Sequence, residues 1–109
     1  MNDRTFVDFV SDQLNALPGF RAKRMFGGHG LYSDDRFFGI VMDGRLYFKT
    51  DDTTREEYVR RGMGPFIYEK ARRTATIDYF EVPPEVLENG QELVSWARVA
   101  IRISTQKKK

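Results

Sequence analysis

The stretch FFGIVMDGRLYFKT, residues 37–50, decides how this chain is interpreted. Runs rich in apolar residues flank the pair Asp43-Gly44. An Asp-Gly pair between two such runs is a strong signal for a two-residue β-hairpin turn, because its central positions take a positive φ. The sequence therefore predicts two antiparallel strands, at 37–42 and 45–50.

A two-residue turn fixes the register and so divides the hairpin into two faces. The first face, which we expect in the core, consists of the pairs Val41 and Leu46, Gly39 and Phe48, and Phe37 and Thr50. The second face consists of the pairs Met42 and Arg45, Ile40 and Tyr47, and Phe38 and Lys49. This second face is too apolar to stay bare, so we expect either a helix of this chain or a second copy in a homodimer to cover it.

Helices are predicted on both sides of this hairpin. An apolar stripe at helical spacing predicts a first helix from near Thr5 that Pro18-Gly19 ends; it comprises Phe6, Val10, Leu14 and Leu17. Asp51 or Asp52 can cap a short helix through Arg61. A last helix follows Asn89, with its apolar face formed by Leu93, Trp96, Ala97, Ala100 and Ile101.

Further strands are predicted at 20–26, 29–33, 66–69 and 74–82. The fold class is therefore α+β: an antiparallel β-sheet of about five to six strands with an N-terminal helix, a short middle helix and a C-terminal helix. We expect residues 1–104 to form a single domain and residues 105–109 to be a disordered basic tail.

Composition narrows the function classes. The 109 residues include no cysteine, which excludes disulfides, thiolate nucleophiles and the usual structural zinc sites. No apolar run approaches the ~20 residues of a membrane span, and the first residues lack the pattern of a signal peptide. We expect a cytoplasmic protein without membrane contact. The formal net charge of +2 falls by three to −1 when the lysines at 107–109 are left out, so the body is close to neutral.

The stretch RMFGGHGLY, residues 24–32, contains Gly27, Gly28, Gly30 and the only histidine, His29. It lacks the lysine and the following helix of a phosphate-binding loop. We therefore interpret it as a bend or β-bulge, and His29 as a surface or sheet-packed side chain. No pattern for serine catalysis or a metal site accompanies it, so we predict no catalytic, cofactor or metal residues and no enzyme.

Three basic clusters are candidate contacts to phosphate or to a partner. They comprise Arg21, Lys23 and Arg24; Arg60 and Arg61; and Lys70, Arg72 and Arg73. The alternative is ordinary solvated charge at the ends of strands and helices, which the near-neutral body favours.

Five motifs resemble the TfoX/Sxy N-terminal domain in the same order. They are RMFGGHGLY (24–32), DGRLYFK (43–49), GPFIY (64–68), YFEVP (79–83) and WAR (96–98). The resemblance makes Arg24, Gly27, Gly28, Gly30, Tyr32, Asp43 and Gly44 a structural motif. It implies an α+β fold and a link to competence regulation, in which longer members help a cyclic-AMP-dependent activator. Because those members carry a second domain, we expect this chain to be a stand-alone form.

Three functions follow as hypotheses. The first is a non-enzymatic regulatory or adaptor domain that contacts an unidentified protein. The second is a nucleic-acid-associated protein that uses the basic clusters and the lysine tail. An enzyme is the third, and convergent acids around His29 would be needed to support it.

Overall fold

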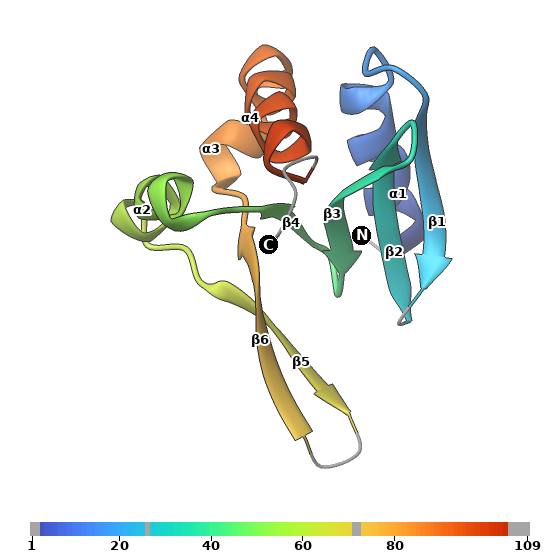
Figure 1. The fold of residues 1–109 in the computed structure, drawn as a ribbon. Coiled ribbons are helices and arrows are strands. Elements are labelled where there is room, and N and C mark those ends of the chain that lie inside the picture. Colours follow the sequence, from blue (N-terminus) through green and yellow to red (C-terminus); the bar gives the residue numbers. More distant parts are fainter. Residues whose placement is uncertain (1–2, 26, 71–72, 105–109) are drawn as a thin grey trace.

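The computed structural model describes residues 3–25, 27–70 and 73–104. The chain forms an α+β fold with a six-stranded antiparallel sheet, as predicted (Figure 1). The elements in chain order are α1 (Asp3–Leu14), β1 (Phe20–Met25), β2 (Gly28–Ser33), β3 (Arg36–Met42), β4 (Arg45–Lys49), α2 (Asp52–Arg60), β5 (Pro65–Lys70), β6 (Arg73–Glu81), α3 (Pro84–Leu87) and α4 (Gly90–Ser104). The sequence did not predict α3. Helix α1 ends at Leu14, earlier than the predicted stop at Pro18-Gly19, and Leu17 joins the core from the segment that follows the helix.

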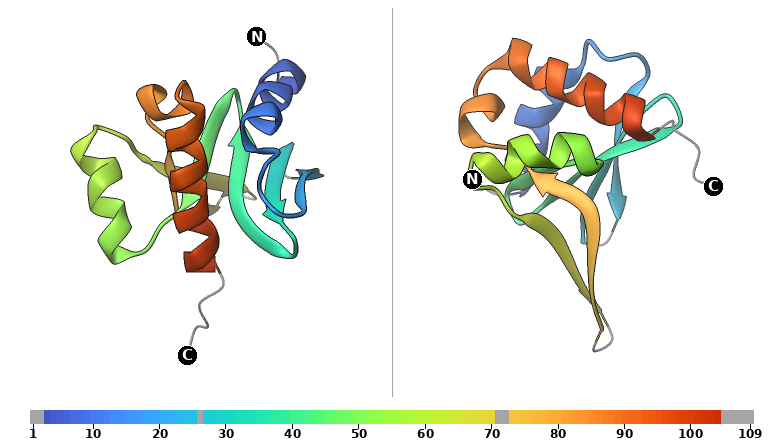
Figure 2. Two further views of the ribbon diagram at one scale, coloured as in Figure 1. Left: turned by 90° about the horizontal axis from the view of Figure 1, so that it is seen from above. Right: turned by 60° about the vertical axis from the view of Figure 1, so that its left-hand side comes forward.

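The sheet order is β1-β2-β3-β4-β6-β5, and every neighbouring pair is antiparallel. The first four strands follow one another as hairpins. The connection through α2 then places β5 at the far edge, and β6 returns between β5 and β4. Beyond their contact with β4, β5 and β6 extend away from the body as a two-stranded arm (Figures 1 and 2).

All four helices contribute to one core on one face of the sheet. Its buried residues include Val10 of α1, Tyr58 of α2, Val86 of α3 and Leu93 of α4. The strands add the apolar side chains Leu31, Phe38, Val41, Leu46, Phe48 and Phe80 to this core. Figure 2 shows α4 lying across this face between α1 and α2.

A β-bulge in β3 corrects the predicted faces of the central hairpin. Leu31 of β2 pairs with Gly39, but the next residue, Tyr32, pairs with Phe37, so Phe38 has no partner on β2. A bulge reverses the alternation of side chains along the strand. Phe38 therefore lies in the helix-covered core and Phe37 on the opposite face, the reverse of the prediction.

The β3–β4 ladder ends earlier than predicted. The four pairs between Gly39–Phe48 and Met42–Arg45 follow the expected register. Thr50, expected opposite Phe37, instead donates its backbone N–H to the carbonyl oxygen of Asp78, at 2.8 Å. The strand thereby leaves β3 and leads into α2.

On the opposite face of the sheet, side chains of the strands pack against one another. A second cluster forms there from Ile40 of β3, Phe66 of β5 and Tyr79 of β6, with partly buried Phe37, Met42 and Tyr47 packed against it. All the described residues of this cluster belong to strands. Ile40 is 0% exposed, so it needs neither a helix nor a second copy to be buried.

Candidate functional site

Helix α2 is positioned by a cap at its first turn. Thr54 donates its backbone N–H to the Asp51 carboxylate at 2.9 Å, and Asp51 donates its backbone N–H to the Thr54 hydroxyl at 3.0 Å. These reciprocal bonds satisfy two backbone groups that a helix start leaves free. The hydrogen bond from Thr54 lowers the pKa of Asp51. The helix ends before Gly62, whose φ of +82° suits glycine.

Helix α4 packs one row of side chains on the sheet and turns a second row toward α2. Glu92 donates its backbone N–H to the Asn89 side chain at 3.1 Å, which caps the helix. The row on the sheet is buried and consists of Leu93, Ala97, Ala100 and Ile103. Trp96 and Val99, in the adjacent row, are half-buried.

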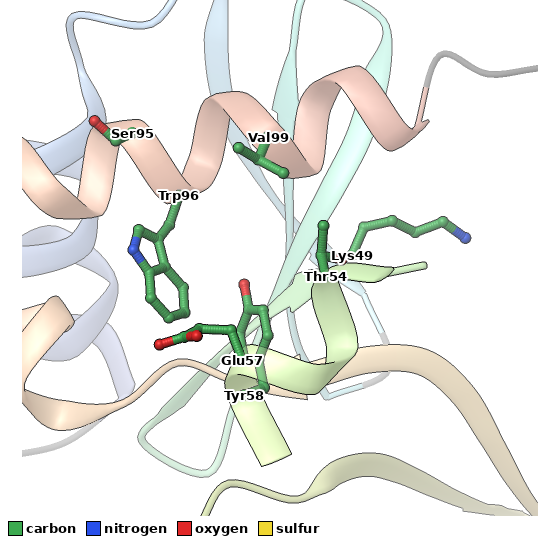
Figure 3. A pocket seen from close by; sticks show the side chains of 7 residues that line it. All are labelled: Lys49, Thr54, Glu57, Tyr58, Ser95, Trp96 and Val99. Atoms are coloured by element: carbon green, nitrogen blue, oxygen red, sulfur yellow. The ribbon is translucent and has the colours of Figure 1, made fainter. Parts of the chain in front are cut away.

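Between α2 and α4 lies a groove of about 230 Å³, which we call the α2–α4 groove (Figure 3). It is lined by Lys49, Thr54, Glu57, Tyr58, Ser95, Trp96 and Val99. The rings of Tyr58 and Trp96 meet edge to face, with centroids 4.9 Å apart. Figure 3 shows the Tyr58 hydroxyl directed toward the space below α4, while the amine of Lys49 points away. Burial raises the pKa of Tyr58, so the phenol is neutral near physiological pH.

Arg61 joins the three elements around the groove. Its guanidinium donates to Glu57 at 2.8 Å and to Glu85, next to the start of α3, at 3.1 Å. The same group lies over the ring of Trp96, 5.2 Å from the centroid. The hydrogen bond from Arg61 lowers the pKa of Glu57, and the pKa of Arg61 is raised in turn. Glu57, which lines the groove, is thus held in an ion-pair network with Arg61 and Glu85.

The glycine motif lies in the connection between β1 and β2 and in β2 itself. Gly27 has a φ of +83°. A Cβ at Gly28 would collide with the carbonyl oxygen of Val41, and a Cβ at Gly30 would lie 2.9 Å from the Phe37 ring. The geometry accounts for glycine at each position in steric terms; that the motif has no other role stays a prediction. At the central turn, Asp43 and Gly44 both have positive φ.

His29 lies in β2, opposite Arg24 of β1. Its Nδ1 atom is buried and has no hydrogen-bond partner among the described residues. In the parts of the chain that the structure describes, no three His, Asp or Glu side chains converge to hold a metal ion. In the same parts, no helix has the length and apolar character needed to cross a bilayer.

The basic clusters lie in three separate regions. Arg21 and Lys23 share one face of β1 and both approach the Tyr32 ring, whereas Arg24 belongs to the opposite face. Lys70 ends β5 and Arg73, its ladder partner, begins β6 at the tip of the arm. Arg72 and the tail at 105–109 lie outside the described residues.

Arg60 and Arg61 of the second cluster are both engaged in ion pairs with Glu57. Helical spacing predicted Trp96 on the core face of the last helix and gave no role to Tyr58 or Val99. The tryptophan on the apolar face of the last helix was the available signal, but spacing alone could not show which helix packs against it.

Comparison with known proteins supplies the family. Residues 12–104 match the family model of the TfoX N-terminal domain. The chain belongs to this family. The resemblance carried by the five motifs is thereby confirmed, and it extends over the β-sheet, the α2–α4 groove and the whole of α4.

Three curated relatives resemble this TfoX N-terminal domain. The DNA transformation protein TfoX1 of Aliivibrio fischeri is 34% identical over 80 residues, which are 73% of this chain and 36% of that protein. Protein Sxy of Escherichia coli is 25% identical over 97 residues, 89% of this chain and 46% of Sxy. An uncharacterized 12.7 kDa protein of Spirochaeta aurantia is 34% identical over 62 residues, covering 57% and 54% of the two chains. This domain thus spans about a third to a half of each relative.

Proposed function

We propose that this TfoX N-terminal domain is a non-enzymatic regulatory module that acts through protein–protein contacts, and that the α2–α4 groove is its contact surface. The observation that carries the proposal is the cluster of Tyr58, Trp96 and Arg61 around an apolar groove. Tryptophan, tyrosine and arginine are the residue types in which binding energy concentrates at protein interfaces.

The groove fits an apolar side chain of a protein partner. Its walls include the Trp96 ring, the Tyr58 ring and Val99, and the Glu57 carboxylate beside them is paired with Arg61. An apolar centre with a polar rim is the usual organisation of such interfaces. The ion-pair network holds the arginine in place before binding, which lowers the ordering cost of association.

Family membership supports the regulatory part of the proposal. One relative is named a DNA transformation protein, and we extend a role in the control of DNA transformation to this chain on that basis. The cytoplasmic location and the absence of catalysis are parts of the same proposal.

Site-specific photo-crosslinking in the native cell tests the contact surface. A photoreactive amino acid replaces Ser95, an exposed residue on the groove, and the crosslinked protein is identified by mass spectrometry. We then expect Val99→Glu, which places a charge in the groove, to weaken binding of the purified partner at least about tenfold. Arg98→Glu, the exposed neighbour on α4, should leave that affinity within about twofold.

The proposal fails if both substitutions weaken binding equally while thermal melting shows both variants folded. It fails also if the crosslink at Ser95 yields no discrete protein while the same amino acid on the β1 edge does.

A further inference from the structure

The sheet face opposite the helices presents a row of aromatic rings. Tyr32 of β2 lies 5.2 Å from Phe37 of β3, and Phe37 lies 5.6 Å from Tyr79 of β6, measured between ring centroids. Tyr79 is buried, while Tyr32 and Phe37 are half-buried. The row runs across the strands. Because Tyr32 and Phe37 are less buried than Tyr79, its accessible end is the one at β2 and β3.

Cations flank this row at both ends. The Arg21 guanidinium lies 5.3 Å and the Lys23 amine 5.6 Å from the Tyr32 centroid. At the other end the Lys49 amine lies 5.3 Å from the Tyr79 centroid. These distances allow cation–π attraction, which holds each charge beside a ring.

These cations differ from the arginines of α2 in having no acidic partner. Among the described residues, no carboxylate forms an ion pair with Arg21, Lys23 or Lys49. The arginines of α2 and its C-cap are all paired: Arg55 with Asp52 and Asp78, Arg60 with Glu57, and Arg61 with Glu57 and Glu85. Arg21, Lys23 and Lys49 therefore leave positive charge on the sheet face that no described carboxylate neutralises.

We propose that this face binds a single-stranded nucleic acid. Unpaired bases stack on aromatic side chains, and flanking lysine and arginine side chains neutralise the phosphates. Tyr32 and Phe37 supply the stacking surface, and Arg21 and Lys23 supply charge beside it. A duplex hides the faces of its bases, so it can use only the charges. The site goes beyond the proposed function, which uses the helix-covered side of the molecule; Lys49, whose side chain also lines the α2–α4 groove, is common to both.

Charge complementarity favours this ligand over a second copy of the chain. A symmetric contact through this face would bring together two copies of the same cationic surface, and like charges repel. Glu81, the acidic side chain of β6 next to this row, is already paired with Arg45 at 3.3 Å.

Fluorescence anisotropy of the full chain tests the proposal. The probes are fluorescein-labelled oligothymidine and oligouridine of ~12 nucleotides and a DNA duplex of the same length, each titrated over a series of salt concentrations. We expect both single strands to bind more tightly than the duplex. Tighter binding of oligouridine or of oligothymidine would identify RNA or DNA as the preferred source of the same chemistry.

Variants separate stacking from charge. We expect Tyr32→Leu to weaken single-strand binding about tenfold or more, because the ring is removed and an apolar side chain kept. Lys23→Gln should make the slope of log affinity against log salt less negative by about 0.7, the value for one phosphate contact on a single strand. Arg60→Gln removes the same charge from α2 and should leave the slope unchanged.

Three results would overturn the proposal. The first is equal affinity for duplex and single strands. The second is an unchanged salt slope in Lys23→Gln, and the third is a change of slope as large in Arg60→Gln, in each case with circular dichroism showing the parental melting temperature for the variants.

Discussion

At the scale of single residues, the three glycines of the 24–32 motif have three different surroundings. Gly27 turns the chain with a positive φ, and nothing lies within 4 Å of the position of its missing Cβ. Gly28 faces the backbone of Val41, which cannot move away without breaking the sheet. Gly30 faces the side chains of Met25 and Phe37, which can adjust. The cost of a methyl group therefore differs among them.

We expect alanine to cost more at Gly28 than at Gly27. Gly28→Ala should lower the free energy of unfolding by about 3 kcal/mol, because a methyl group meets rigid backbone. Gly27→Ala should lower it by about 1 kcal/mol, the cost of a positive φ. Gly64→Ala is the control: its φ is not positive and its surroundings are open, so a change within about 0.5 kcal/mol is expected. Urea denaturation measures all three. Equal stability of the Gly28 and Gly64 variants would show that the Val41 carbonyl leaves room for a methyl group at position 28.

At the scale of elements, local signals in the sequence predict turns and strand register but not long-range packing. The Asp43-Gly44 turn predicted the β3–β4 register over four residue pairs, because turn geometry determines register. It failed at Phe37 and Phe38, since a bulge depends on how β2 pairs with β3 and has no local signature here. The α2–α4 groove was missed for the same reason: helical spacing shows which row of α4 is apolar, but not that Trp96 meets Tyr58.

The start of α2 gives a pH-dependent prediction. Asp51→Ala should destabilise the protein by about 1 kcal/mol at pH 7, whereas Asp51→Asn should retain most of the cap. The folded-state pKa of Asp51 lies below its usual 3.8. Stability from the ionised cap is therefore present above pH 3.8 and is lost as pH falls through the lowered folded-state pKa. Urea denaturation at pH 7 and at about pH 2 should show a smaller difference between parent and Asp51→Ala at the lower pH. A difference independent of pH would contradict an ionic cap.

At the scale of the whole molecule, the reason for expecting a homodimer is weakened. Ile40 is fully buried by residues of its own chain. We therefore expect sedimentation equilibrium at micromolar concentration to give one species of 12.7 kDa. Ile40→Lys should unfold the protein, because it buries an unpaired charge. Met42→Lys, at a half-buried margin of the same cluster, should remain folded. A species of twice the mass that Ile40→Lys converts to a folded monomer would instead establish the face as an interface.

The bulge in β3 also couples the two cores. Phe37 belongs to the sheet-only cluster and Phe38 to the helix-covered core, and one peptide bond joins them. Neither phenylalanine can leave its cluster without displacing the backbone that anchors the other. The two cores should therefore behave as one cooperative unit, although α2 and the β5–β6 arm extend in different directions. Thermal unfolding followed by Trp96 fluorescence and by far-ultraviolet circular dichroism should give superimposable transitions.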